Sequence, residues 1–360
     1  MIIGPMTQIS QPTSSVSAAP VAGAVRLSDF GVMHAQGEEA AKFLHSQLTQ
    51  DLALQTLQQA RLAGFCSAKG RLLATMLAVK PDHQSVLMAL PADVLPATLK
   101  RLSMFVLRAK CKLSDASGDW AVWGLSGEVA EQWLGEVMGA QPPAQTWQVG
   151  RFMAAAGPVQ DGASPAQDAG TPSQVAAGGA TQEAPQALVT RLPDDGTGPR
   201  FLLLQPSAAP APALPALALE DWQGLDVRAG LAWVRGATVE QFVPQMVNLE
   251  VIGGVNFQKG CYPGQEVVAR SQYRGTIKRR THPFALDGEV TPQLAQEIFH
   301  SEDPGQPAGL VAATGRSAGH PVLLAEVKLA ALETGSLHLG SAAGPRLTLQ
   351  PLPYTVGEPQ

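Results

Sequence analysis

Short apolar runs, each bounded by glycine or proline, recur along the last part of the chain, from residue 282 to residue 360. Runs of this kind, separated by turn residues, are typical of strands. Their spacing predicts a small antiparallel β barrel or sandwich over residues 282–360. The runs are residues 284–286, 310–314, 322–327, 336–339 and 347–349.

The region before residue 282 combines helical and strand patterns. Residues 37–48 predict one helix, and a second is predicted after Asp93, which is placed to cap it. Between them, residues 62–66 and 72–79 predict two strands joined by a turn at residues 67–70. An α+β fold is therefore expected. The apolar positions are Ala40, Leu44 and Leu48 in the first helix and Leu95, Leu99, Leu102 and Val106 in the second.

Two segments have compositions that do not support a packed core. The first 25 residues contain no charged side chain, and residues 154–187 lack Leu, Ile, Lys, Arg and every aromatic residue. Such segments bury too little apolar surface to offset the entropy lost on ordering. We expect a disordered lead-in over residues 1–25 and a flexible insertion at residues 154–187, within a folded region that spans residues 26–281.

The overall composition, 45% hydrophobic and 15% charged over 360 residues, is that of a globular protein. The net charge of −5 excludes a global basic field, so nucleic acid is not the default partner. No apolar stretch is long enough to span a bilayer, and no secretory or mitochondrial leader is indicated. The bacterial cytoplasm is the expected location.

Three cysteines lie far apart and form no Cys-x-x-Cys pair, so neither a disulfide framework nor a metal site is expected. One of them, Cys261, follows Lys259 and Gly260 and precedes Pro263-Gly264, the residue order of a type II turn. If residues 265–270 form a helix, its N-terminal N–H groups and Lys259 favour a charged thiolate at Cys261. This predicts an exposed, reactive thiol; the alternative is a buried structural cysteine.

Basic residues are concentrated around this cysteine in an otherwise acidic chain, and they face one acid, Glu266. The pattern predicts a local anion site for a carboxylate, a phosphate or an RNA backbone. A solvated basic surface is the alternative. The basic residues are Lys259, Arg270, Arg274, Lys278, Arg279 and Arg280.

Polar residues upstream of the cysteine alternate with apolar ones. Gln245, Asn248 and Glu250 are placed to form a hydrogen-bonding wall for the edge of a heteroaromatic ring. Phe30 and Trp222 follow acidic residues and offer faces for stacking on a flat ligand, with core packing as the alternative. No Walker, Rossmann or nucleophile-elbow motif stands in a convincing context, and Cys–His chemistry stays open, with His282 downstream of the motif.

Residues 257–266, Phe-Gln-Lys-Gly-Cys-Tyr-Pro-Gly-Gln-Glu, resemble the YgfZ-type folate-binding proteins, which are relatives of the glycine-cleavage aminomethyltransferase, or T-protein. The likeness extends from Leu27 to Tyr354. It implies a T-protein-like ring of α/β lobes around a central folate pocket, with a C-terminal β barrel. It also implies a role in maintaining iron–sulfur clusters, including those of radical enzymes that thiolate tRNA. Further matching segments are residues 47–51, 66–71, 226–230, 244–250 and 352–354.

The resemblance implies functional residues as well. Cys261 corresponds to the motif cysteine, with Lys259 beside it, and the folate-stacking tryptophans of the family correspond to Phe30 and Trp222. Phe30 keeps a stacking face but lacks the indole N–H. The other expected contacts to a tetrahydrofolate are Gln245, Asn248, Tyr262, Gln265, Glu266 and Arg270.

The chain departs from the transferase branch of this family at one position. That branch carries a catalytic carboxylate after a Gly-Gly turn, and the matching residues 69–75 contain no acid. We therefore expect a tetrahydrofolate-binding accessory protein, rather than an enzyme, that serves iron–sulfur client enzymes through Cys261. One alternative is a folate-dependent one-carbon transferase with an acid from elsewhere. Another is a module that binds tRNA directly through residues 270–280.

Overall fold

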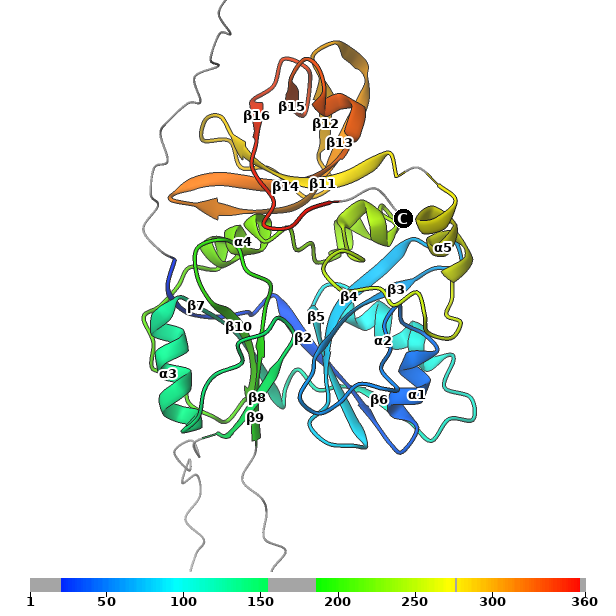
Figure 1. Cartoon of the computed structure of the whole chain (residues 1–360), viewed down its shortest axis with the longest axis vertical. Coiled ribbons are helices and arrows are strands. Elements are labelled where there is room, and N and C mark those ends of the chain that lie inside the picture. The colour runs from blue at the N-terminus through cyan, green and yellow to red at the C-terminus, as the bar shows by residue number, and fades with distance from the viewer. Residues whose placement is uncertain (1–20, 155–185, 276, 357–360) are drawn as a thin grey trace, which may run out of the picture.

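The computed structural model describes residues 21–154, 186–275 and 277–356. Two α/β lobes lie side by side, and a closed β barrel rests across both of them (Figure 1). The predicted α+β fold with a C-terminal barrel is therefore confirmed. Among the described residues, no helix is long and apolar enough to cross a bilayer.

The first lobe is a five-stranded antiparallel sheet in the order β3-β4-β5-β2-β6, with two helices on one face. Along β4, Ala74 and Met76 pack toward the helices, whereas Leu77 and Val79 point to the opposite face. Because alternate residues of a strand face opposite ways, both faces of this sheet are buried. The elements are β2 Phe30–Gln36, α1 Ala40–His45, β3 Arg61–Cys66, β4 Leu72–Val79, β5 Ser85–Pro91, α2 Leu95–Ser103 and β6 Lys112–Asp115.

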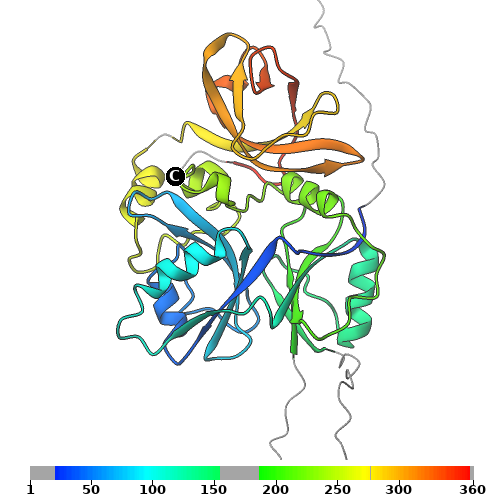
Figure 2. The ribbon, with the colours of Figure 1, turned by 180° about the vertical axis from the view of Figure 1, so that it is seen from behind.

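The second lobe is a five-stranded sheet in the order β1-β7-β10-β9-β8, with α3 packed on one face through Ala130 and Leu134. The N-terminal segment joins the lobes, because β1 pairs with β7 of the second lobe and β2 pairs with β5 of the first (Figure 2). The elements are β1 Gly23–Arg26, β7 Trp120–Ser126, α3 Glu128–Met138, β8 Val149–Met153, β9 Gln186–Arg191 and β10 Arg200–Pro206.

The helix α4, Leu219–Arg228, lies between the second lobe and the barrel. It meets strand β13 backbone to backbone: a methyl group on Gly224 would collide with the carbonyl of Arg316, and one on Gly315 with the backbone of Gly224. The remaining elements are α5 Gln265–Tyr273, β11 Arg279–Leu286, β12 Glu297–His300, β13 Asp303–Ser317, β14 His320–Lys328, β15 Leu337–Leu339 and β16 Arg346–Leu349, with short 3-10 helices at Gly236–Thr238, Pro244–Val247 and Leu329–Leu332.

Several expected boundaries are corrected by these elements. The lead-in expected over residues 1–25 ends earlier, because Gly23 already pairs in β1; residues 1–20 lie outside the described part. The insertion expected at residues 154–187 is narrower, because β9 begins at Gln186; residues 155–185 likewise lie outside the description. The barrel begins at Arg279 rather than at residue 282.

Two local predictions also change. Asp93 does not cap α2, because its Oδ2 accepts a hydrogen bond from the backbone N–H of Gly236 at 2.8 Å, and the helix has no side-chain cap. The first helix is also shorter than residues 37–48, ending at His45. The two strands at residues 62–66 and 72–79 are confirmed as the antiparallel pair β3 and β4.

Candidate functional site

A cavity of about 190 Å³ lies where the lobes meet the barrel. Its walls come from the loop before α2, from α4, from the chain that follows α4 and from β13. The cavity therefore draws on all three parts of the fold. Its lining includes Asp93, Gln223, Asp226, Trp233, Arg235 and Thr314.

Trp233 supplies the aromatic surface of this cavity, and the sequence did not single it out. Its Nε1 donates to Oδ2 of Asp226 at 3.1 Å. Phe30 packs edge-on against Trp233, with 5.2 Å between ring centroids, and does not itself line the cavity. A stacking role thus fits Trp233, with Phe30 supporting its ring. One sequence signal for Trp233 was available: it lies three residues after residues 226–230, a segment that matches the family.

Trp222, the other predicted stacking residue, lies in the core. Its ring packs beneath Gly124 of β7, where an added methyl group would come within 2.6 Å of the ring. The guanidinium of Arg200 lies over the same ring, 5.0 Å from its centroid. Trp222 is 2% exposed and does not line the central cavity, so the structure supports the core-packing alternative for this residue.

Asp226 contributes a carboxylate to the cavity wall, and the sequence did not single this residue out. Its other oxygen, Oδ1, accepts a hydrogen bond from Arg200, whose side chain is fully buried. Complete burial raises the pKa of Asp226, and the Arg200 cation offsets part of that rise. A carboxyl group held between two donors in this way is rigidly oriented at the cavity wall.

Arg235 adds a cation to the same wall. It forms an ion pair with Asp29 at 2.7 Å, and its guanidinium lies 5.2 Å from the centroid of the Phe30 ring. Oδ1 of Asp29 is buried and has no hydrogen-bond partner within the described part of the chain. Buried polar atoms are rarely left without a partner, so this oxygen is available to a ligand or a water molecule.

A second cavity, of about 310 Å³, adjoins the first at Asp93, which lines both. Its walls are largely apolar, with Phe65, Leu73 and Met104, and two exposed cations, Lys100 and Arg101, also line it. The two cavities together offer a polar, aromatic chamber beside an apolar one that carries positive charge.

The predicted cysteine turn is present. The backbone N–H of Gln265 donates to the carbonyl of Tyr262 at 3.2 Å, and Gly264 has φ of 79°, as a type II turn requires. The helix α5 begins at Gln265, and Cys261 is exposed. Gly264 packs tightly on the β3–β4 turn, where an added methyl group would lie 2.8 Å from Cα of Gly70. The exposed-thiol prediction is therefore confirmed over that of a buried structural cysteine.

Lys259 does not reach into solvent. Its Nζ donates to the carbonyl oxygens of His45 and, at 2.9 Å, Leu48, and it lies 4.7 Å from the centroid of the Tyr262 ring. Burial lowers the pKa of Lys259 to about 8, although the negative charges of Asp51 and Cys261 act in the opposite direction. At neutral pH its cation therefore lies beside the thiol, held by the end of α1.

His45 lies beside the cysteine turn, and it is a second residue that the sequence did not single out. Its Nδ1 lies 2.9 Å from Oδ1 of Asp51, and its Nε2 faces Gly260, where an added methyl group would lie 3.6 Å away. His282, the histidine named from the sequence, lies instead on β11 of the barrel, paired with Ala325. Residues 45–51 meet the cysteine segment only through long-range packing. The local sequence contains no signal for that contact, so it could not identify His45.

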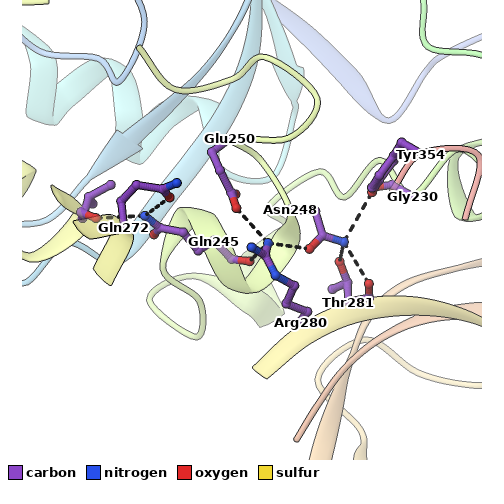
Figure 3. A network of polar contacts seen from close by, with 9 residues as sticks. Gly230, Gln245, Asn248, Glu250, Gln272, Arg280, Thr281 and Tyr354 are labelled. Carbon is purple, nitrogen blue, oxygen red and sulfur yellow. Dashed lines mark hydrogen bonds and ion pairs between the residues drawn. The ribbon is translucent and has the colours of Figure 1, made fainter. Parts of the chain in front are cut away.

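Gln245, Asn248 and Glu250 form an internal network rather than a free wall (Figure 3). Arg280 donates to the carbonyl of Gln245 at 3.1 Å, to Oδ1 of Asn248 at 3.0 Å and to Oε1 of Glu250 at 2.7 Å. The amide of Asn248 donates to the carbonyl of Thr281 at 2.9 Å. These contacts tie the segment before the cysteine to the barrel, and they occupy the amide of Asn248 and one carboxylate oxygen of Glu250. Oε1 of Gln245 and Oε2 of Glu250 are buried and have no partner among the described residues.

Three of the six basic residues near Cys261 form ion pairs, which corrects their expected role in an anion site. Arg270 pairs with Glu266 at 2.8 Å, Arg279 pairs with Glu326, and Arg280 is buried against Glu250. Within the described residues, Arg274 and Lys278 have no ion pair. The solvated-face alternative describes Arg270, whereas Arg279 and Arg280 are structural.

The structure separates the predicted ligand contacts into two places. Tyr262, Gln265, Glu266 and Arg270 lie on the cysteine turn and α5, and none of them lines either of the two cavities. Tyr262 is buried, which raises its pKa, and its hydroxyl has no partner among the described residues. The cysteine turn and the two cavities are therefore different parts of the molecule.

The arrangement of lobes and barrel is that of a T-protein-like fold. The structure resembles glycine cleavage system aminomethyltransferase T from Bartonella henselae, with a TM-score of 0.64 and 17% sequence identity, over 93% of this chain and 87% of that one. At this identity the likeness concerns the fold alone. No family model matches the sequence.

Among curated proteins, the chain is similar to several named tRNA-modifying protein YgfZ. It is 29% identical over 348 residues to the protein from Edwardsiella ictaluri (strain 93-146), 28% over 342 residues to that from Photorhabdus laumondii and 27% over 343 residues to that from Sodalis glossinidius. Each alignment covers 93% of both chains. The resemblance to YgfZ-type proteins that the cysteine motif predicts is confirmed.

Proposed function

We propose that this protein binds a tetrahydrofolate and supports the assembly or repair of iron–sulfur clusters in enzymes that modify tRNA. The observation that carries the proposal is the pairing of Trp233 and Asp226 at the central cavity. An aromatic face beside an oriented carboxylate suits a flat heterocycle whose edge carries N–H donors. The names of the YgfZ relatives support the link to tRNA modification.

The residues at the two cavities fit a folate. Trp233 would stack on the pterin ring, and Asp226 would accept hydrogen bonds from its amino edge. The unpartnered oxygen of Asp29 supports the presence of a further donor nearby. The adjoining cavity, with Lys100 and Arg101, suits the remainder of the molecule, which ends in carboxylates. When bound, a tetrahydrofolate supplies one-carbon or reducing chemistry.

Cys261 would serve the client enzymes at a separate surface. One cysteine cannot hold an iron–sulfur cluster alone, so cluster contact would be transient and shared with ligands of the client. The exposed position of Cys261 next to the Lys259 cation supports this role. The predicted folate contacts at Gln265, Glu266 and Arg270 are, on this proposal, better assigned to the client surface, whereas Tyr262 is buried beneath it. The protein would act in the bacterial cytoplasm, beside its clients.

The experiment compares Cys261→Ala with Cys111→Ala in cells that lack the chromosomal copy. Thiolated tRNA bases would be quantified under oxidative stress, and tetrahydrofolate binding would be measured by calorimetry on the purified proteins. We expect Cys261→Ala to lose the thiolated bases while it keeps folate affinity, and Cys111→Ala to keep both. Normal levels of thiolated bases in the Cys261→Ala strain would contradict the proposal.

A second candidate function is folate-dependent one-carbon transfer. Asp226 and Asp93 favour it, because they bring to the cavity the carboxylates that residues 69–75 lack. Incubating the protein with methylene- or formyl-tetrahydrofolate and candidate acceptors would separate the two functions. Turnover that is kept in Cys261→Ala but lost in Asp226→Asn, under conditions where circular dichroism shows that this variant is folded, would establish transfer as the activity.

A further inference from the structure

Residues 45–51 and the segment before the cysteine are bonded into one unit. The hydroxyl of Thr49 donates to the carbonyl of Gly254 at 2.6 Å, and the amide of Gln50 donates to the carbonyl of Gly253 at 2.6 Å. The backbone N–H of Asn256 donates in turn to the carbonyl of Thr49 at 2.9 Å. Groups more than 200 residues apart in sequence are thus held in a fixed relation.

Lys259 extends this connection to within two residues of the thiol. Its ammonium group bonds the carbonyls of His45 and Leu48, at the end of α1. His45 and the turn that carries Cys261 are therefore joined through the buried Lys259 cation. Small relative movements of the two segments would break these bonds.

Asp51 fixes the orientation of the His45 ring. Its Oδ1 accepts from the backbone N–H of Leu54 at 2.9 Å and lies 2.9 Å from Nδ1 of His45. Burial acts to raise the pKa of the Asp51 carboxyl, but these hydrogen bonds outweigh it and hold that pKa below its usual value. An ionised carboxylate only accepts, so Nδ1 carries the hydrogen and a neutral ring presents its lone pair at Nε2.

The Nε2 atom faces the cysteine turn. A methyl group added at Gly260 would lie 3.6 Å from Nε2 and would meet no other atom within 4 Å. Within the described chain, Nε2 has no hydrogen-bond partner, and the exposed thiol belongs to the next residue. A carboxylate, an imidazole and a thiol in this order form the pattern of an activated cysteine nucleophile.

We propose that His45, oriented by Asp51, is the proton acceptor of Cys261. In this step the S–H bond breaks and the proton passes to Nε2, which leaves a thiolate and an imidazolium. Asp51 stabilises the imidazolium, and the Lys259 ammonium stabilises the thiolate. The inference rests on the proposed role of Cys261 and identifies what would make that thiol reactive.

The other titratable groups around this centre do not replace His45. Lys80 donates to the carbonyl of Gln55, and the Tyr262 ring covers the Lys259 cation. The thiol of Cys66 is buried, and burial raises its pKa to about 12. Neither Cys66 nor Tyr262 is ionised at neutral pH, so neither of them can take the proton of Cys261.

The test follows the rate at which the full chain reacts with iodoacetamide between pH 5 and 9.5. Cys111 is replaced by serine throughout, so that Cys261 is the accessible thiol, and thiolate absorbance at 240 nm is recorded in parallel. An ordinary cysteine is only a few per cent thiolate at pH 7, and it is half ionised at about pH 8.5. We expect substantial thiolate below pH 7, and about a tenfold slower reaction at pH 7 in His45→Gln with its midpoint moved toward that of an ordinary thiol.

The matched control is His83→Gln, which alters an exposed histidine in the turn between β4 and β5 and should leave the profile unchanged. Asp51→Asn should move the midpoint in the same direction as His45→Gln. If the protein without histidine substitutions already titrates like an ordinary thiol, the inference fails whether or not the variants fold. A slower rate at every pH with no shift of midpoint would also overturn it. None of these outcomes depends on folate binding or on tRNA, so this experiment tests the role of His45 separately from the proposed function.

Discussion

The indole N–H of Trp233 donates to Asp226 at 3.1 Å, and both side chains line the cavity between the lobes and the barrel. The second carboxylate oxygen of Asp226 is held by Arg200 of β10. The oriented acid of this cavity therefore comes from α4, between the second lobe and the barrel, and not from the β3–β4 turn of the first lobe. This relation determines which substitutions should affect ligand binding and which should affect only folding.

Trp233→Leu should weaken tetrahydrofolate binding, because it removes both the stacking face and the donor that orients Asp226. Stacking of a heterocyclic base on an aromatic side chain contributes about 1–3 kcal/mol, so the Kd should rise by roughly one order of magnitude. Calorimetric titration would measure the change. The matched variant is Trp222→Leu, which alters a buried tryptophan outside the cavity and should leave Kd within about twofold. The reverse ranking would return the stacking role to Trp222.

Asp226→Asn should destabilise the fold, because it leaves the fully buried guanidinium of Arg200 without its counter-charge. Breaking a buried ion pair from one side costs about 3–5 kcal/mol. Urea unfolding followed by circular dichroism would give the difference in free energy of unfolding. Asp194→Asn, which removes an exposed partner of Arg191, should cost less than about 1 kcal/mol. Equal losses in the two variants would contradict this account.

Lys259→Met should change how stability depends on pH. The pKa of Lys259 is about 8 in the folded protein, against 10.5 for an unperturbed lysine. Between these values the unfolded chain still binds a proton that the folded chain has released, so the stability contributed by this group rises with pH. The stability of the wild type relative to Lys259→Met should therefore increase from pH 8 to pH 10.5, by at most about 3 kcal/mol. Urea midpoints across this range would show it, and Lys42→Met, at an exposed lysine, should give no such trend.

Gly264→Ala should disturb the cysteine turn, because its φ is positive and an added methyl group would collide with the β3–β4 turn. Gly260→Ala lies in the same motif, but its methyl group would meet only Nε2 of His45, at an ordinary contact distance of 3.6 Å. We expect a lower melting temperature and faster proteolysis near residue 264 for the first variant only. Similar melting temperatures for the two variants would show that the close packing at Gly264 is dispensable.

The sequence correctly predicted those features that are determined by residues close together in the chain. The Pro263-Gly264 turn, the pair β3 and β4 and the short barrel strands each follow from turn residues beside apolar runs. Strand β12 was missed, because Glu297 and His300 interrupt its short apolar run. The arrangement of lobes followed from the family resemblance rather than from periodicity.

Long-range pairing accounts for the rest. Arg280 stands in a basic run, yet it is buried because Glu250 meets it from 30 residues earlier in the chain. His45 reaches Gly260 only through the fold, and Trp233 rather than Trp222 lines the cavity because α4 turns Trp222 toward β7. Such choices depend on which face of an element meets which neighbour, and the spacing of residues within one element does not contain that information.

The contact between Gly224 of α4 and Gly315 of β13 has a consequence for how a ligand enters the central cavity. With no side chain on either residue, the two backbones lie too close to slide or separate without losing the packing of the whole helix. A movement of the barrel relative to the lobes would therefore have to carry α4 with it. On the proposed folate role, the Arg235–Asp29 ion pair is a contact at the cavity wall that side-chain rotation can open while the backbone stays in place.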